Sequence, residues 1–223
     1  DDTSIYVIVD DHDDAASCLN SDLNRICEWA NNWQVNFNPN KTETVLFSRK
    51  QMRSNIPTLS MNGTPIKEVH NHKHLGIVLQ NDCKWKSHID DIVGKISPMI
   101  NCLRSFKYRL SRKSLETMYK SFILPTFDYA SHIWDNCTIE QKLTLENLHL
   151  DAIRTICGAV RGTSHNKLYS ETGFTTLEKR RNSQKLCMFY KMENNLVPTY
   201  LSSLLPNRIS ESTTYNLRNQ QNY

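Results

Sequence analysis

The sequence predicts an α+β fold in which a mixed lobe precedes a helical lobe. Up to residue 82, short runs rich in β-branched and aromatic residues accompany one long stretch with helical spacing. Beyond residue 84, apolar residues recur every three or four positions. An apolar content of 39% in 223 residues supplies a core for one large domain or two small lobes.

The first lobe is predicted to contain several strands and one long helix. Residues 5–9 form a β-branched and aromatic run that is typical of a buried strand. Apolar spacing then predicts a helix over 10–33, and strands are expected at 42–48 and 73–80. Between those strands, Asn62-Gly63 separates two short extended runs, which is the signal of a two-residue β-hairpin.

The second lobe is predicted to be helical throughout. The expected helices cover 85–103, 114–134, 139–157, 166–171 and 177–194. Pro98 and Pro125 are expected to kink or interrupt the first two helices, and Gly158 to end the third. Residues 206–223 are rich in Ser, Thr and Asn, and are expected to form a flexible tail.

Composition excludes several classes of protein. No apolar run approaches the roughly 20 residues of a membrane-spanning helix, and the N-terminus lacks the order of a signal peptide. The seven cysteines stand far apart without metal-ligand spacing, which favours buried free thiols in a reducing compartment over disulfides or zinc. We therefore expect a soluble intracellular protein with no membrane partner.

Charge is distributed unevenly along the chain. Residues 1–40 carry eight acidic groups and one basic group, whereas the remaining residues carry 15 acidic and 26 basic groups. This polarity suits a protein that handles a polyanion through bound cations. The alternative is an acidic helix start combined with ordinary solvated lysines.

Two acidic groups of residues are candidate cation ligands. Asp1 and Asp2 precede the first predicted strand, and adjacent carboxylates in such a place can hold two divalent cations. The alternative is an Asp-Asp turn. The aspartates at 10, 11, 13 and 14 fall in the first turns of the predicted helix, where they complement its dipole rather than bind metal.

A basic segment lies between Asp91 and Glu116 and contains no acidic residue. Phe106 and Tyr108 interleave with its cations, so that phosphates and bases both have suitable contacts. The predicted nucleic-acid-binding residues are Lys95, Arg104, Lys107, Arg109, Arg112 and Lys113. Lys179-Arg180-Arg181 is a weaker candidate of the same kind, and for both groups the alternative is a solvated helix surface.

Six motifs follow one another along the chain. They are Asp1-Asp2-Thr3-Ser4-Ile5-Tyr6, then Leu19-Asn20-Ser21-Asp22-Leu23 with Trp29, Asn38-Pro39-Asn40-Lys41-Thr42, Lys73-His74-Leu75-Gly76-Ile77, Trp85 with His88-Ile89, and the stretch from Tyr119 to Tyr129. In this order they resemble the motifs of the reverse transcriptases of non-LTR (LINE-like) retrotransposons. The resemblance covers most of the chain and weakens after about residue 160.

The resemblance implies the C-terminal part of a right-hand polymerase palm followed by an all-α thumb. Residues 1–82 would be the partial palm and 83–205 the thumb with its following helices. The implied reaction transfers a nucleotide from a dNTP to a primer 3′-hydroxyl with two Mg²⁺ ions. An RNA template and a DNA primer are the implied partners, with a dNTP in the complete enzyme, and the sequence does not identify any protein partner.

The resemblance also assigns roles to single residues. Asp1 would ligate metal with Asp2 beside it, and Lys41 would lie near the pyrophosphate or be a solvated turn lysine. Lys73, Leu75 and Gly76 match the primer grip, where a glycine lets backbone approach the primer terminus. The alternative for Gly76 is a plain strand glycine at a bulge.

The isolated chain is expected to be inactive. The family's active site needs a further upstream Asp and the dNTP-binding fingers, and neither occurs among these residues. A non-catalytic nucleic-acid-binding remnant is the second hypothesis, and a helical interaction protein with an acidic partner is the third. For a retroelement product, the expected location is the nucleus or the cytoplasm.

Overall fold

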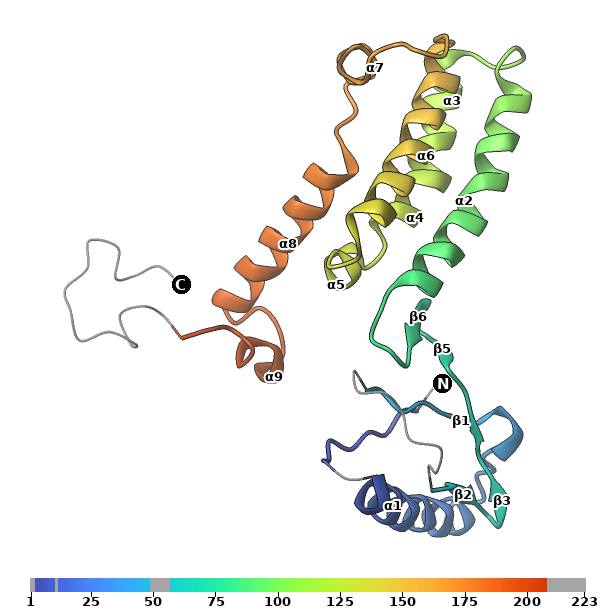
Figure 1. The fold of residues 1–223 in the computed structure, drawn as a ribbon, viewed down its shortest axis with the longest axis vertical. Coiled ribbons are helices and arrows are strands. Elements are labelled where there is room, and N and C mark those ends of the chain that lie inside the picture. The colour runs from blue at the N-terminus through green and yellow to red at the C-terminus, as the bar shows by residue number, and fades with distance from the viewer. Residues whose placement is uncertain (1–2, 11, 49–56, 208–223) are drawn as a thin grey trace, which may run out of the picture. The chain divides into compact units, whose positions relative to one another are not determined.

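The protein is an α+β structure whose regular elements fall in two compact units. The computed structural model describes residues 3–10, 12–48 and 57–207. Clustering of contacts divides the chain into Asp1–Asp91 and Ile92–Tyr223, so the division lies within helix α2, Lys86–Phe106. The first unit contains α1 (His12–Asn32), a 3₁₀ helix (Pro39–Lys41), β1 (Glu43–Thr44), β2 (Ser60–Met61), β3 (Thr64–Pro65), β4 (Lys67–Glu68), β5 (Asn71–His74) and β6 (Ile77–Gln80) (Figure 1).

Among the described residues of the first unit, the strands form three two-stranded sheets. β1 pairs with β4 in parallel, while β2–β3 and β5–β6 are antiparallel hairpins. The predicted Asn62-Gly63 turn is confirmed, with φ of 50° and 73° at its two residues. Both values lie in the left-handed region that Asn and Gly tolerate.

Helix α1 supplies the core of the first unit. Its buried Leu23 and Cys27 pack against Met61 and Ile66 from the β2–β3 region. The side chain of Asn20 accepts a hydrogen bond from the Ser60 backbone N–H at 3.0 Å. Helix α1 is therefore held to β2 by both apolar and polar contacts (Figure 1).

Three strand predictions were wrong in whole or in part. Residues 5–9 are irregular, and their Tyr6 and Ile8 side chains are 86% and 89% exposed, because no described strand pairs with this segment. Only Glu43–Thr44 of the expected strand over 42–48 is paired. The single strand expected over 73–80 is instead a hairpin, because the backbone reverses at Leu75 and Gly76.

The second unit is helical, as predicted. After α2 it contains α3 (Arg112–Met118), a π-helical turn (Tyr119–Ile123), α4 (Leu124–Asp128), α5 (Ser131–Trp134), α6 (Ile139–Cys157), α7 (His165–Thr172), α8 (Leu177–Glu193) and α9 (Thr199–Ser202) (Figure 1). The helix expected over 114–134 is divided into short pieces. Pro125, which lacks an N–H donor, stands in the first turn of α4.

Helix α6 lies at the centre of this unit and packs against α3, α7 and α8. Thr138 and Gln141 form a capping box at its start, and Gly158 ends it with a φ of 68°. Leu145, Leu150 and Ile153 are at most 1% exposed. Local end signals and a long apolar stripe agree here, which explains why the predicted bounds are correct.

The cysteines match the prediction only in part. All seven are free, but four of them are exposed, namely Cys18, Cys83, Cys102 and Cys187. Their positions lie away from the apolar faces of their helices and turns, so wide spacing alone did not predict burial. None of the helices in the described ranges has the length and apolar character needed to span a membrane. The predicted tail falls mostly outside these ranges.

Candidate nucleic-acid interface

The residues predicted to ligate metal cannot be placed. Asp1 and Asp2 lie outside the described residues. Among residues 3–10, 12–48 and 57–207, no cluster of three or more His, Cys, Asp or Glu side chains is arranged to hold a metal ion. The magnesium site therefore remains a prediction from the motif.

Lys41 ends a short capped turn. The Asn38 side chain accepts a hydrogen bond from the Asn40 N–H at 3.0 Å, and Thr42 Oγ1 donates to the Asn38 carbonyl at 3.1 Å. Pro39 has its φ fixed for the first turn of the 3₁₀ helix. This local geometry explains most of the Asn-Pro-x-Lys-Thr motif, and it leaves the Lys41 side chain exposed.

The β5–β6 hairpin carries the three predicted primer-grip residues. Leu75 and Gly76 form its two-residue turn with φ of 46° and 83°, and Leu75 is 67% exposed. Left-handed backbone is unfavourable for leucine. Lys73 lies on β5, and its Nζ is 3.3 Å from both carboxylate oxygens of Asp91 on α2.

The start of α2 anchors this hairpin. His88 Nδ1 accepts a hydrogen bond from the Val78 N–H at 3.3 Å, and Ser87 Oγ donates to Gln80 Oε1 at 2.9 Å. The Trp85 ring meets His88 edge-on with centroids 6.0 Å apart. Sequence analysis missed Ser87 and Asp91 as supporting residues, because their partners on the hairpin become evident only once the chain is folded.

The basic segment contains cations with an acidic partner in the protein and cations without one in the described part of the chain. Arg104 contacts the Asn101 side chain at 2.8 Å and Asp151 on α6 at 3.3 Å. Lys107 places its Nζ 5.3 Å from the ring centroid of Tyr108, which is itself 91% exposed. Arg109 and Lys113 are exposed and make no ion pair within the described part of the chain. Phe106, by contrast, is half-buried, and Lys95 is exposed on α2.

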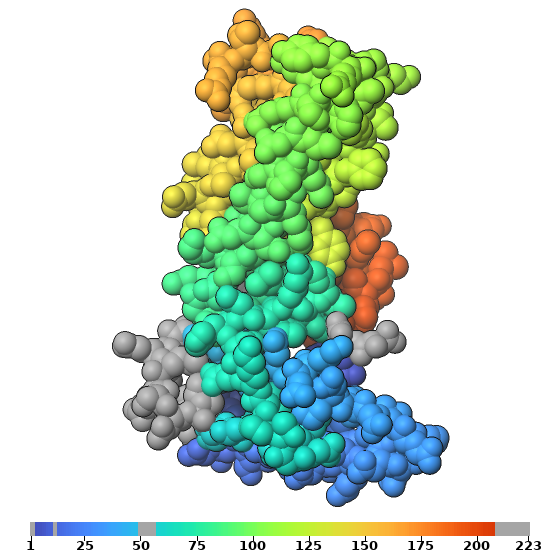
Figure 2. Space-filling view, turned by 90° about the vertical axis from the view of Figure 1, so that its right-hand side faces the viewer, coloured from blue at the N-terminus to red at the C-terminus, as the bar shows by residue number. Residues whose placement is uncertain are grey.

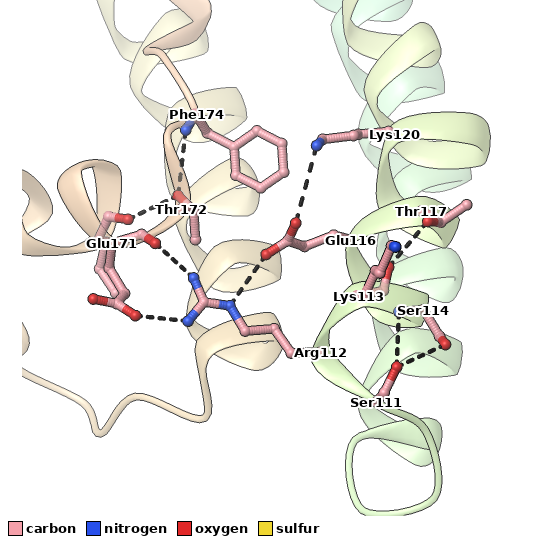
Figure 3. Close-up of polar contacts among 11 residues, drawn as sticks. Ser111, Arg112, Lys113, Ser114, Glu116, Thr117, Lys120, Glu171, Thr172 and Phe174 are labelled. Atoms are coloured by element: carbon pink, nitrogen blue, oxygen red, sulfur yellow. Dashed lines mark hydrogen bonds and ion pairs between the residues drawn. The ribbon is translucent and has the colours of Figure 1, made fainter.

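Arg112 is exposed, but its guanidinium is hydrogen-bonded to acidic residues of the protein. Its Nε is 3.1 Å from Glu116 Oε1, and its two terminal nitrogens lie 2.6 Å from Glu171 Oε1 and from the Glu171 carbonyl oxygen (Figure 3). The hydrogen bonds to Glu171 and then to Glu116 raise the pKa of the Arg112 guanidinium. Arg112 thus ties the start of α3 to the end of α7.

The Lys179-Arg180-Arg181 group is mainly structural. Arg180 forms a two-pronged contact with Asp128. Arg181 is only 3% exposed and donates to Asp135 at 2.7 Å, with its guanidinium over the Trp134 ring. These pairs hold α8 to α4 and α5, which leaves Lys179 as the exposed cation of the three.

Comparisons with known proteins point to retroelement polymerases. The chain is 26% identical over 173 residues to the probable RNA-directed DNA polymerase from transposon X-element of Drosophila melanogaster, which covers 74% of this chain. It is 28% identical over 149 residues to the RNA-directed DNA polymerase from mobile element jockey of the same species, and 27% identical over 110 residues to the Pol polyprotein of type-1 retrotransposable element R1 of Bradysia coprophila. The chain is similar in sequence to RNA-directed DNA polymerases and a Pol polyprotein of mobile elements.

This polymerase-related region is short compared with its relatives. The matches cover 19% of the X-element protein, 16% of the jockey protein and 11% of the R1 protein, and 65% and 48% of this chain for the last two. No family model matches the sequence, and no solved structure matches it. The relation therefore rests on sequence similarity to these mobile-element proteins.

Proposed function

We propose that this chain is part of an RNA-directed DNA polymerase, with residues 1–82 in the palm and 83–205 in the thumb and its following helices. The observation that carries the proposal is similarity to such polymerases over 173 residues, together with the six motifs in family order. The α+β unit followed by a helical unit is compatible with this assignment. Such an enzyme extends a DNA primer along an RNA template inside the cell, in the nucleus or the cytoplasm.

The proposed catalytic residues are Asp1, Asp2 and Lys41. Carboxylate oxygens are the ligands that Mg²⁺ prefers, and Asp1 would ligate it with Asp2 adjacent. Bound Mg²⁺ would supply charge stabilisation for nucleotidyl transfer from the dNTP to the primer 3′-hydroxyl. The exposed Lys41 ammonium would stabilise the pyrophosphate leaving group.

The proposed primer grip is the tip of the β5–β6 hairpin. Its two turn residues present backbone rather than a regular strand edge, and Gly76 adds no side chain there. Strained backbone at Leu75 is the kind of feature that functional sites retain. Lys73 would act by fixing the hairpin to α2 through Asp91, which places it as a positioning residue.

The proposed duplex contacts are the exposed cations of the α2–α3 loop and the start of α3. Arg109 and Lys113 would neutralise phosphates, and the half-buried Lys107 would add a third cation beside the exposed Tyr108 ring. Arg104 and Arg112 would contribute less, because acidic partners already occupy them.

The test of this proposal uses the 223-residue chain itself. We expect it to retain an RNA–DNA duplex at low salt, with an affinity that falls as salt rises, and to extend no primer when Mg²⁺ and dNTPs are added. Failure to retain the duplex would contradict the proposed interface. Extension by the chain alone would contradict the expected inactivity, whereas binding without extension is also what a non-catalytic remnant would give.

A further inference from the structure

The loop between α6 and α7 is a second segment without acidic residues. From Ala152 to Ser170 the sequence has no Asp or Glu. Arg161, His165 and Lys167 are exposed, and none of them makes an ion pair within the described ranges. The loop begins at Gly158 and also contains Gly162, and both glycines have left-handed backbone, with φ of 68° and 94°.

This loop lies beside the α2–α3 loop. The Lys107 Cε atom is 3.9 Å from the position that a Cβ on Gly158 would occupy. Both loops lie at the same end of the helical unit in Figure 1, and the space-filling view in Figure 2 shows the orange and green segments side by side there. Two segments separated in sequence by the elements from α3 to α6 thus lie side by side.

Arg112 fixes this arrangement. Its contacts with Glu171, two of them at 2.6 Å, hold α7 against the start of α3 (Figure 3). The hydrogen bond of Arg104 to Asp151 at 3.3 Å likewise joins α2 to α6 just before the loops begin. Two cations that sequence analysis assigned to nucleic acid therefore assemble the surface instead.

The acidic residues near the two loops are already paired. Asp151 contacts Arg104 and Arg154, and Glu171 contacts Arg112. Glu116 contacts Arg112 at 3.1 Å and Lys120 at 4.0 Å. The excess positive charge of the surface therefore rests on the remaining cations, which are Lys107, Arg109, Lys113, Arg161 and Lys167.

We infer that the α2–α3 loop, the α6–α7 loop and the first turn of α7 form one phosphate-binding surface, in which Arg161 of the loop and Lys167 of α7 contact the sugar–phosphate backbone of a nucleic-acid duplex. A backbone with a charge at every nucleotide can neutralise cations on two loops at once. Arg161 offers a planar fork that suits phosphate oxygens, and the Lys167 ammonium offers a point charge. This inference rests on the proposed function and extends its interface beyond α3.

The test measures duplex binding by the full chain across a salt series. The variants are R161A/K167A, the α2–α3 set K107A/R109A/K113A, and the control K67A/K191A, which removes two exposed lysines that lie on β4 and near the end of α8. Each lost phosphate contact should make the negative slope of log affinity against log salt shallower by about 1. R161A/K167A should therefore make the slope shallower by about 2, and the control K67A/K191A should leave it unchanged. Circular dichroism should show that all variants are folded.

The outcomes separate this inference from the proposed function. If the wild type binds and only the α2–α3 set weakens binding, the second loop is not part of the surface and the inference is overturned. If the wild type does not bind duplex, the proposed interface fails as well. Equal retention of a poly-glutamate peptide, lost in R161A/K167A, would show an acidic-protein site and overturn the assignment to nucleic acid.

Discussion

Arg112 shows why a basic segment cannot be interpreted from charge alone. The sequence places it among cations that suit phosphate, but Glu116 and Glu171 surround its guanidinium. The i, i+4 spacing indicates the pair with Glu116, but Glu171 is 59 residues away in sequence, so spacing does not reveal it. Side chains such as Arg109, which lack a partner in the described structure, are better candidates for binding.

Replacing Arg112 should lower the stability of the chain even when the positive charge is kept. Arg112→Lys keeps the positive charge but loses the planar fork that reaches both the side chain and the backbone of Glu171. Since the pair is partly exposed, we expect a loss of about 1 kcal/mol in the free energy of unfolding. Urea unfolding measures this loss. Lys113→Ala should cause no comparable change, and an unaltered Arg112→Lys midpoint would contradict the positioning role.

His149 is the centre of a buried polar network in the helical unit. The Tyr119 hydroxyl donates to His149 Nδ1, and His149 Nε2 donates to the Thr175 carbonyl at 3.1 Å. Burial lowers the pKa of His149, although the nearby Glu146 charge opposes this shift. The ring is 0% exposed, so its neutral form fits the site.

The stability of the chain should consequently depend on pH. The pKa of His149 in the folded chain lies below the value of about 6.5 in the unfolded chain. As the pH falls through about 6.5, the unfolded state therefore binds more protons than the folded state. The free energy of unfolding should be highest above that pH and decline below it. Denaturant titrations between neutral and mildly acidic pH measure the decline. His149→Asn should flatten it, and the exposed His165→Gln should not; a profile unchanged by His149→Asn would refute the assignment.

Among the secondary-structure elements, the two hairpins of the first unit place different residues in left-handed turn positions. The β2–β3 turn has Asn62 and Gly63 at φ of 50° and 73°, and the β5–β6 turn has Leu75 and Gly76 at 46° and 83°. Asparagine tolerates left-handed backbone, whereas leucine is disfavoured there. Leu75 therefore stands where an asparagine would be more stable.

Exchanging these residues should have opposite effects on stability. Leu75→Asn should raise the free energy of unfolding by about 0.5–1 kcal/mol, and Asn62→Leu should lower it by about the same amount. Urea unfolding of the two variants measures both changes. If the exposed Leu75 belongs to the primer grip, Leu75→Asn should also reduce primer extension by the complete polymerase. A stable variant with full extension would leave no functional reason for the leucine.

Asp135 joins three helical elements. Its carboxylate contacts Arg181 at 2.7 Å, Lys185 at 2.5 Å and Lys142 at 3.4 Å. Burial raises the pKa of Asp135, but hydrogen bonds from Lys185 and Arg181, together with the Lys142 charge, outweigh this and lower it. The network links the end of α5 to α6 and α8.

Asp135→Asn should be among the more damaging polar substitutions. It leaves the buried Arg181 charge without its counter-ion, which costs on the order of 3 kcal/mol. Thermal and urea unfolding of the variant measure this loss. Glu28→Gln, at an exposed carboxylate on α1, is the control and should change stability little. Equal stabilities for the two variants would contradict the role of Asp135.

Helices were predicted better than strands for physical reasons. Helix α6 carries its end signals within its own sequence, in Thr138 and Gly158, and its backbone bonds are local. A strand depends on a partner that the sequence does not identify, so residues 5–9 and 73–80 were misjudged. The Asn62-Gly63 hairpin was predicted because both of its strands and its turn are adjacent.

For the molecule as a whole, the sequence motifs indicate the similarity to mobile-element polymerases. The structure then shows which of the predicted site residues are paired within the protein and which are exposed. The matched stretches cover 48–75% of the chain but only 11–28% of the relatives. Of the predicted site residues, Lys73 and Arg112 have ion-pair partners that suggest positioning. Arg109 and Lys113 retain the exposure that binding requires. The sequence alone could not separate the paired residues from the exposed ones, because the acidic partners lie on α2 and α7, far away in sequence.

The proposed function makes these residues part of a polymerase that copies RNA into DNA. The most direct measurement is primer extension on an RNA template, with Mg²⁺ and dNTPs, by the complete product of the reading frame that encodes them. We predict extension by the wild type, its loss in Asp1→Ala, and normal extension by Asp13→Ala, which changes an exposed residue of α1. Extension that persists in Asp1→Ala would contradict the catalytic assignment, and a wild type that binds duplex without extending a primer would contradict the polymerase itself.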